Sequence, residues 1–172
     1  MLFNNNEEIN QALQGIATQD NGDLVINNAD KLRGDILDKL VLNAATNPSA
    51  EIKGLSRFII KSAALELGIV NSSIQGLYET RGRGEIKGFT VPALNIRGLP
   101  YELCRAIFRT AIKTDAGAFI FELAKSEMVY TFQKPQELSA VILAAAIKEG
   151  YKGPVFIQGD HFQVNAKNYA QD

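Results

Sequence analysis

The stretch "KPQELSAVILAAAIKEGYKGPVFIQGDHF" (134–162) decides the fold of this chain. Its first half has Pro135 near the start, apolar residues at helical spacing and a glycine at the end, a pattern that predicts one helix. Its second half contains "PVFIQG" (154–159), a short apolar run typical of a buried strand. This strand ends in Asp160 and His161, and His161 is the only histidine in the sequence.

The same alternation precedes this stretch. "FTVPALNI" (89–96) predicts a strand, "PYELCRAIFRTAIKT" (100–114) a helix and "GAFIFEL" (117–123) a second strand. The order strand, helix, strand, helix, strand favours parallel pairing with helical crossovers, as in an α/β protein. The repeat length fits a (β/α) barrel and equally a doubly wound sheet.

The region before residue 71 predicts a different organisation. Residues 1–70 form a helical N-terminal segment, in which a first helix ends near Asn21 and Gly22, a second covers about 29–45 and a third about 49–67. Residues 71–88 are polar and rich in glycine, and we predict a connecting loop there. Its glycines and arginines could also cradle a phosphate, but no helix-opening pattern follows, so the connector is favoured.

Composition and charge limit the class of protein. Hydrophobic residues make up 46% of the 172 residues and charged residues 22%, a balance typical of a folded globular protein. The formal net charge of −1 gives no field that would attract nucleic acid or an anionic membrane surface. With a single cysteine, no signal-peptide pattern and no apolar run of about 20 residues, we expect a cytoplasmic protein.

Four polar residues lie at or near the predicted ends of the strands: Asn95, Glu122, Asp160 and His161. In parallel α/β folds these ends meet at one edge of the sheet, where ligands bind. A neutral imidazole is a good zinc ligand, and a carboxylate beside the metal can carry a proton. We expect the side chains of the adjacent Asp160 and His161 to diverge, so that one faces a metal and the other a substrate. The alternative is that His161 is a surface histidine bonded to a backbone carbonyl.

Two further stretches contain residues capable of chemistry. Cys104 lies in the predicted helix 100–114, where no histidine could activate it, so we predict a small core residue. "KSEMVY" (125–130) is a candidate loop that closes over a ligand, and Tyr130 and Phe132 could stack on that ligand, although aromatic packing under a loop is commoner.

At these residues the sequence resembles the class II, metal-dependent fructose-bisphosphate and tagatose-bisphosphate aldolases. The likeness covers about residue 86 to the end. It rests on "GFTVPALNI" as the first strand of a barrel, "GAFIFEL" as the second and "GPVFIQGDHF" as the third, which ends in Asp-His. The resemblance implies a partial (β/α)8 TIM barrel in residues 89–172, consisting of the first three β-strands.

The resemblance also implies a function, namely aldehyde-lyase activity with zinc as cofactor. The reaction would be retro-aldol cleavage, or aldol condensation, of a ketose phosphate such as fructose 1,6-bisphosphate. Asp160 matches the catalytic aspartate, which moves the proton of the hydroxyl next to the broken carbon bond. His161 matches a zinc ligand, and Asn95 matches the first-strand asparagine near the substrate. Zinc would act as a Lewis acid on the substrate carbonyl. The sugar phosphate is the expected partner, and the full-length protein is expected to be a homo-oligomer.

The chain departs from the family pattern in two ways. Gln158 stands where the family often has a histidine, which leaves the substrate open. The family's zinc site needs two later histidines, and none follows His161. We therefore expect an incomplete fragment of a longer aldolase that is inactive alone and whose third strand is a bare edge that invites self-association.

Two alternatives stay open. The chain could be a catalytically inactive remnant that acts as an assembly or scaffold module, in which case the purified chain holds no metal. It could also be a different (β/α) enzyme, or a doubly wound binding domain that shares only the strand pattern.

Overall fold

The computed structural model describes residues 1–20, 22–164, 166, 167 and 169. The helices are α1 (Asn6–Ala12), α2 (Ala29–Lys31), the π-helical turn η1 (Leu32–Ile36), α3 (Leu37–Thr46), α4 (Ala50–Glu66), α5 (Gln75–Gly82), α6 (Pro100–Thr114), α7 (Glu127–Thr131) and α8 (Pro135–Glu149). The strands are β1 (Ala17–Asp20), β2 (Asp23–Ile26), β3 (Ile69–Ser72), β4 (Ala93–Asn95), β5 (Ile120–Ala124) and β6 (Gly153–Asp160).

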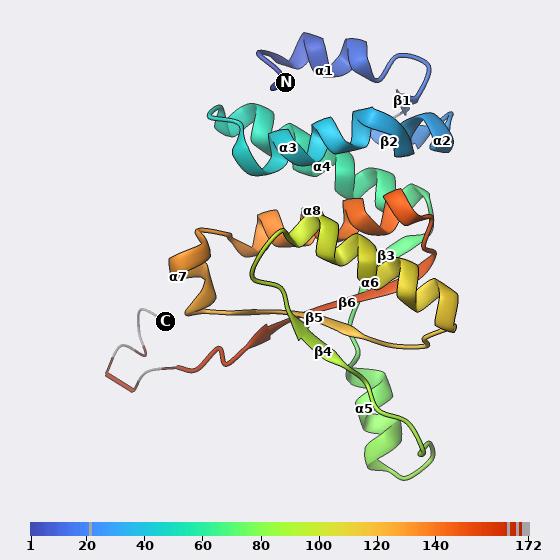
Figure 1. Cartoon of the computed structure of the whole chain (residues 1–172), viewed down its shortest axis with the longest axis vertical. Helices are drawn as coiled ribbons and strands as arrows, with labels where there is room; N and C mark the ends of the chain where they lie inside the picture. Colours follow the sequence, from blue (N-terminus) through green and yellow to red (C-terminus); the bar gives the residue numbers. More distant parts are fainter. Residues whose placement is uncertain (21, 165, 168, 170–172) are drawn as a thin grey trace.

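The centre of the fold is a four-stranded sheet in the order β3-β6-β5-β4 (Figure 1). All three pairings in this sheet are parallel, and the register aligns Asn95 with Glu122 and Glu122 with Gln158. The predicted α/β fold with parallel strands is thus confirmed. The three expected strands are present, although β4 is much shorter than the predicted 89–96.

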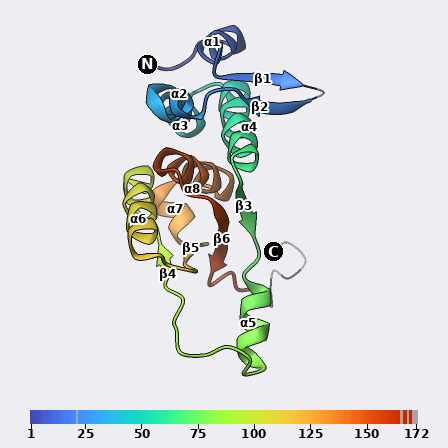
Figure 2. The same ribbon diagram turned by 90° about the vertical axis from the view of Figure 1, so that its right-hand side faces the viewer.

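Helices α6 and α8 lie together along one face of this sheet (Figures 1 and 2). Phe121 and Leu123 of β5 point into the main core on that side, where the ring of Phe108 from α6 lies 5.3 Å from that of Phe121. Ile120 and Ala124 alternate with them and are buried outside the main core cluster, as the two-residue period of a strand requires. The sheet therefore has one helix-covered face and one face lined by the alternate side chains.

The helix boundaries follow the signals in the sequence. α8 begins at Pro135, whose missing N–H costs nothing in a first turn, and ends before Gly150, which has the left-handed φ of 71°. α8 is buried over most of its circumference because α6 covers it on one side and α3 and α4 on another. One continuous core therefore joins the N-terminal helices to the sheet.

The prediction that the N-terminal segment is helical throughout is wrong. α1 ends at Ala12, and β1 and β2 then form an antiparallel hairpin. The predicted stop at Gly22 falls between these two strands, and Asn21 lies outside the described residues. The second predicted helix is interrupted at Gly34, where ψ is −151°. The third, α4, agrees with the prediction and is capped by Ser49, whose side chain accepts from the N–H of Ile52.

The region predicted as a connecting loop, 71–88, contains regular structure. It includes the end of β3 and the whole of α5, which projects from the end of the sheet opposite the N-terminal layer (Figure 1). β3 pairs with β6 along four residues, so the expectation of a bare edge at the third strand is wrong. Within the described sheet, β3 and β4 are the outer strands. None of the described helices has the length and apolar character that a membrane crossing requires.

Candidate functional site

Two of the predicted site residues meet at the carboxyl ends of the parallel strands. Asn95 is the last residue of β4 and Asp160 is the last residue of β6. The Nδ2 amide of Asn95 donates to Oδ2 of Asp160 at 3.0 Å, although 65 positions separate them in the chain. Both side chains are only partly buried, so the pair can be reached from solvent.

Glu122 lies level with Asn95 in the register of the sheet, two residues before the position of Asp160. Its carboxylate accepts a hydrogen bond from the side-chain amide of Gln158, its register partner on β6. The structure thus places Glu122 on the same face of the sheet as Asp160 but engages it with Gln158. Gln158 therefore holds this carboxylate.

His161 follows the last residue of β6 and has a left-handed φ of 51°. This conformation turns the ring back, and Nε2 lies 3.3 Å from Oδ1 of Asp160. The side chains of Asp160 and His161 therefore converge, and the expectation that they diverge is wrong because the strand ends between them. The His161 side chain is 78% exposed, so the imidazole is accessible.

The chain folds back immediately after the strand. The ring of Phe162 lies on the backbone of Gly159, so close that a Cβ added to Gly159 would be 2.5 Å from the ring. A side chain at this position of the Gly-Asp-His sequence would therefore displace the Phe162 ring.

The structure adds a buried carboxylate that was not among the predicted site residues. Glu127, at the start of α7, is only 2% exposed. It accepts hydrogen bonds from the backbone N–H of Ala124 at 2.8 Å, from Nδ2 of Asn95 at 3.3 Å and from Nε of Arg97 at 2.5 Å. We refer to Asn95, Arg97, Glu127 and Asp160 as the strand-end cluster.

The electrostatics of Glu127 follow from these contacts. Burial acts to raise the pKa of the Glu127 carboxyl, but the Ala124 N–H, the Asn95 amide and the Arg97 guanidinium together lower it below its usual value. The hydrogen bond between Arg97 and Glu127 also raises the pKa of Arg97. Glu127 is therefore an ionised group enclosed by donors, as a buried carboxylate must be.

Glu127 falls within the stretch 125–130 that was considered as a ligand-closing loop. The structure forms the short helix α7 there, while Tyr130 and Phe132 are 59% and 82% exposed. The sequence signal was the position of an acidic residue just after a strand, but its partners lie about 30 residues earlier in the chain.

The donors available to a metal are few. Within the part of the chain that the structure describes, no group of three His, Cys, Asp or Glu side chains is arranged to hold a metal ion. His161 fits the role of a single ligand, since its imidazole is exposed beside a carboxylate.

Cys104 of α6 is completely buried and unpaired. Burial raises the pKa of its thiol to about 12, so the thiolate is not populated at neutral pH. The prediction of a core cysteine is confirmed.

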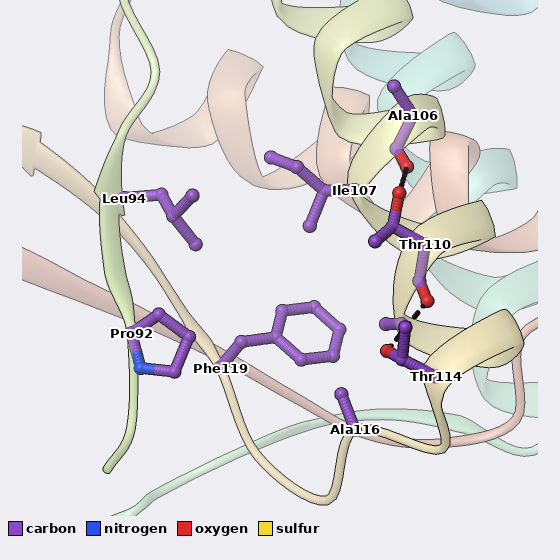
Figure 3. Close-up of a pocket in the computed structure, with 9 residues that line it drawn as sticks. Pro92, Leu94, Ala106, Ile107, Thr110, Thr114, Ala116 and Phe119 are labelled. Atoms are coloured by element: carbon purple, nitrogen blue, oxygen red, sulfur yellow. Dashed lines mark hydrogen bonds between the residues drawn. The ribbon is translucent and has the colours of Figure 1, made fainter.

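A separate apolar groove lies between the edge strand β4 and helix α6 (Figure 3). It has a volume of about 380 Å³, and the ring of Phe119 is part of its lining. No charged side chain lines it, and the hydroxyls of Thr110 and Thr114 are bonded to carbonyls of their own helix. The groove therefore offers none of the chemistry found at the strand-end cluster.

Comparisons with protein-family models, with curated proteins and with solved structures find no match to this chain.

Proposed function

We propose that the chain contributes to the active site of a zinc-dependent aldehyde-lyase that cleaves a ketose phosphate such as fructose 1,6-bisphosphate. The observation that carries this proposal is the 3.0 Å contact between Asn95 and Asp160 at the carboxyl ends of parallel strands, with His161 beside it. This is where ligands bind in parallel α/β folds.

The winding of β4, β5 and β6 favours a barrel over a doubly wound sheet, whereas the position of β3 does not. The strands β4, β5 and β6 follow one another across the sheet in chain order, and their connecting helices α6 and α8 share one face. A doubly wound sheet reverses its direction and places helices on both faces. β3 occupies the outer edge of β6, where a barrel would add its next strand. If the sheet closes into a barrel like that of the aldolases, β3 must therefore separate from β6.

The cluster suits the proton transfer of a retro-aldol reaction. Asp160 has a side chain that is 24% exposed, and its carboxylate can accept the proton of the substrate hydroxyl next to the breaking carbon bond. As that proton leaves, the hydroxyl carbon becomes an aldehyde, and the electrons of the broken bond pass to the ketone half of the substrate. Asn95 holds the Asp160 carboxylate while this happens. A zinc ion bound through His161 would polarise the substrate ketone.

The test is zinc content and cleavage of fructose 1,6-bisphosphate and tagatose 1,6-bisphosphate, measured on the protein expressed from the complete reading frame. His161→Ala should lose bound zinc and cleavage together. Gln163→Ala, a nearby exposed position, is the matched control and should keep both. Zinc and cleavage that survive His161→Ala would refute the assigned role of His161. A wild-type protein that holds no metal and does not cleave would favour the scaffold alternative.

A further inference from the structure

Asn95 connects two carboxylates through a single amide nitrogen. Its Nδ2 atom lies 3.0 Å from Oδ2 of Asp160 and 3.3 Å from each carboxylate oxygen of Glu127. An amide nitrogen has two hydrogens, so one is directed to each carboxylate. The opposite amide orientation would place an oxygen against two anions, which fixes the assignment.

Both amide hydrogens of Asn95 are thus committed within the protein. A ligand that meets Asn95 can use only Oδ1, which accepts hydrogen bonds. Asn95 is therefore suited to receive a hydroxyl group of the substrate and not to donate to a phosphate or carbonyl oxygen.

Glu127 is held more firmly than Asp160. Glu127 is 2% exposed and receives donors from Ala124 and Arg97 in addition to Asn95. The Asp160 side chain is 24% exposed, and its carboxylate contacts the Asn95 amide and the neighbouring imidazole. Glu127 is therefore the fixed end of this cluster, and Asn95 connects it to the more exposed Asp160 carboxylate.

We propose that Glu127 is a positioning residue for the proton transfer, which acts through Asn95 to fix the Asp160 carboxylate and to present Asn95 Oδ1 to a substrate hydroxyl. This inference rests on the proposed function. Displacing a reacting group by about 1 Å can cost about 100-fold in rate, so a loosened Asn95 should reduce turnover.

The experiment compares Glu127→Gln with Glu149→Gln in the zinc-loaded protein expressed from the complete reading frame. Glu149 is a matched control, since it is also a poorly exposed glutamate (11%) paired with arginines, at the far end of α8. Glu127→Gln should lower kcat about 10- to 100-fold with little change in KM, whereas Glu149→Gln should leave both unchanged. An unchanged kcat in a folded Glu127→Gln variant would overturn the proposal.

A double variant separates positioning from general damage to the structure. In the Asp160→Asn background, Glu127→Gln should have almost no further effect on cleavage, because the group that it positions has lost its function. Independent, multiplicative losses would overturn the proposal. Because replacing a buried carboxylate can unfold a protein, Arg97→Gln is a second variant. Arg97 is 58% exposed, and its loss should lower kcat in the same direction by about 3- to 10-fold.

The side-chain amide signals of Asn95 in NMR spectra give a readout that does not depend on activity. They should move in Glu127→Gln and stay in place in Glu149→Gln. A wild-type protein without cleavage would refute the proposed function alone. In that case the amide signals decide: unchanged Asn95 signals in Glu127→Gln would overturn the positioning role as well.

Discussion

Replacing Asn95 by aspartate changes the charge of the strand-end cluster with almost no change in the shape of the side chain. The Nδ2 donor that now bonds Asp160 at 3.0 Å and Glu127 at 3.3 Å would become an oxygen facing two carboxylates. Two hydrogen bonds to charged groups would be lost, and repulsion would take their place.

The magnitude can be worked from these distances. Two like charges about 4 Å apart repel by about 4 kcal/mol at an effective dielectric constant of about 20. Proton uptake and the partial exposure of Asp160 reduce that figure, while the lost hydrogen bonds add about 1–3 kcal/mol. We expect Asn95→Asp to lower the free energy of unfolding by about 2–5 kcal/mol at pH 7.

The pH dependence of this loss of stability shows whether charge repulsion causes it. A carboxyl introduced beside two others has a folded-state pKa above its unfolded value, so its penalty is complete above the folded pKa and is relieved as the pH falls through it. Urea unfolding of Asn95→Asp between pH 8 and pH 5 should show a loss that shrinks toward low pH. Asn71→Asp, on the exposed surface of β3, is the control and should change stability by less than about 0.5 kcal/mol. Equal losses in the two variants, or a loss independent of pH, would refute the arrangement.

Three other predictions concern single residues. Because the folded pKa of Glu127 lies below its unfolded value, its charge stabilises the chain at neutral pH and this contribution is lost as the pH falls through the folded pKa. Glu127→Gln should therefore flatten the acid limb of the stability curve, and an unchanged limb would contradict the reasoning. Cys104, with a pKa raised to about 12, should resist iodoacetamide at pH 8 until the chain unfolds, so rapid labelling of the native protein would count against its burial. Phe108→Ala should cost about 3–5 kcal/mol in chemical unfolding, compared with much less for the half-exposed Phe58→Ala, and similar costs would place Phe108 outside the core.

The helices and strands around the sheet were predictable because their signals are local. Pro135 starts α8 and Gly150 ends it, and both can be recognised in the sequence. The hairpin of β1 and β2 was not predicted, although the Asn-Gly dipeptide at 21–22 is a typical hairpin signal, because the apolar spacing before it favours a helix.

β3 could not be found in the same way. It has four residues, of which two are exposed, and its partner β6 lies more than 80 positions later in the chain. The edge that β3 covers was for that reason predicted to be bare. Short strands of this kind are specified by pairing with a distant neighbour and not by their own composition.

The candidate site was predictable in part. Strand ends place Asn95 and Asp160 on one edge of a parallel sheet, and the structure brings them into contact. Glu127 was not predicted, since its importance depends on burial and on donors from Asn95 and Arg97, which no local pattern reveals. The orientation of His161 was also missed, because it depends on a left-handed φ beyond the strand end.

The most direct test of the central claim is the rate of carbon bond cleavage in Asp160→Asn, measured on the zinc-loaded protein from the complete reading frame. Asp38→Asn is the control, an aspartate of α3 paired with Lys148 of α8 at 2.8 Å. Helix α3 lies on the opposite side of α8 from the sheet (Figure 1). If Asp160 moves the substrate hydroxyl proton, cleavage of fructose 1,6-bisphosphate should fall by about 10²- to 10⁴-fold. Exchange of carbon-bound protons of the ketone product with solvent, a step that moves no hydroxyl proton, should persist. Cleavage by Asp160→Asn at the rate of the Asp38→Asn control would contradict the account.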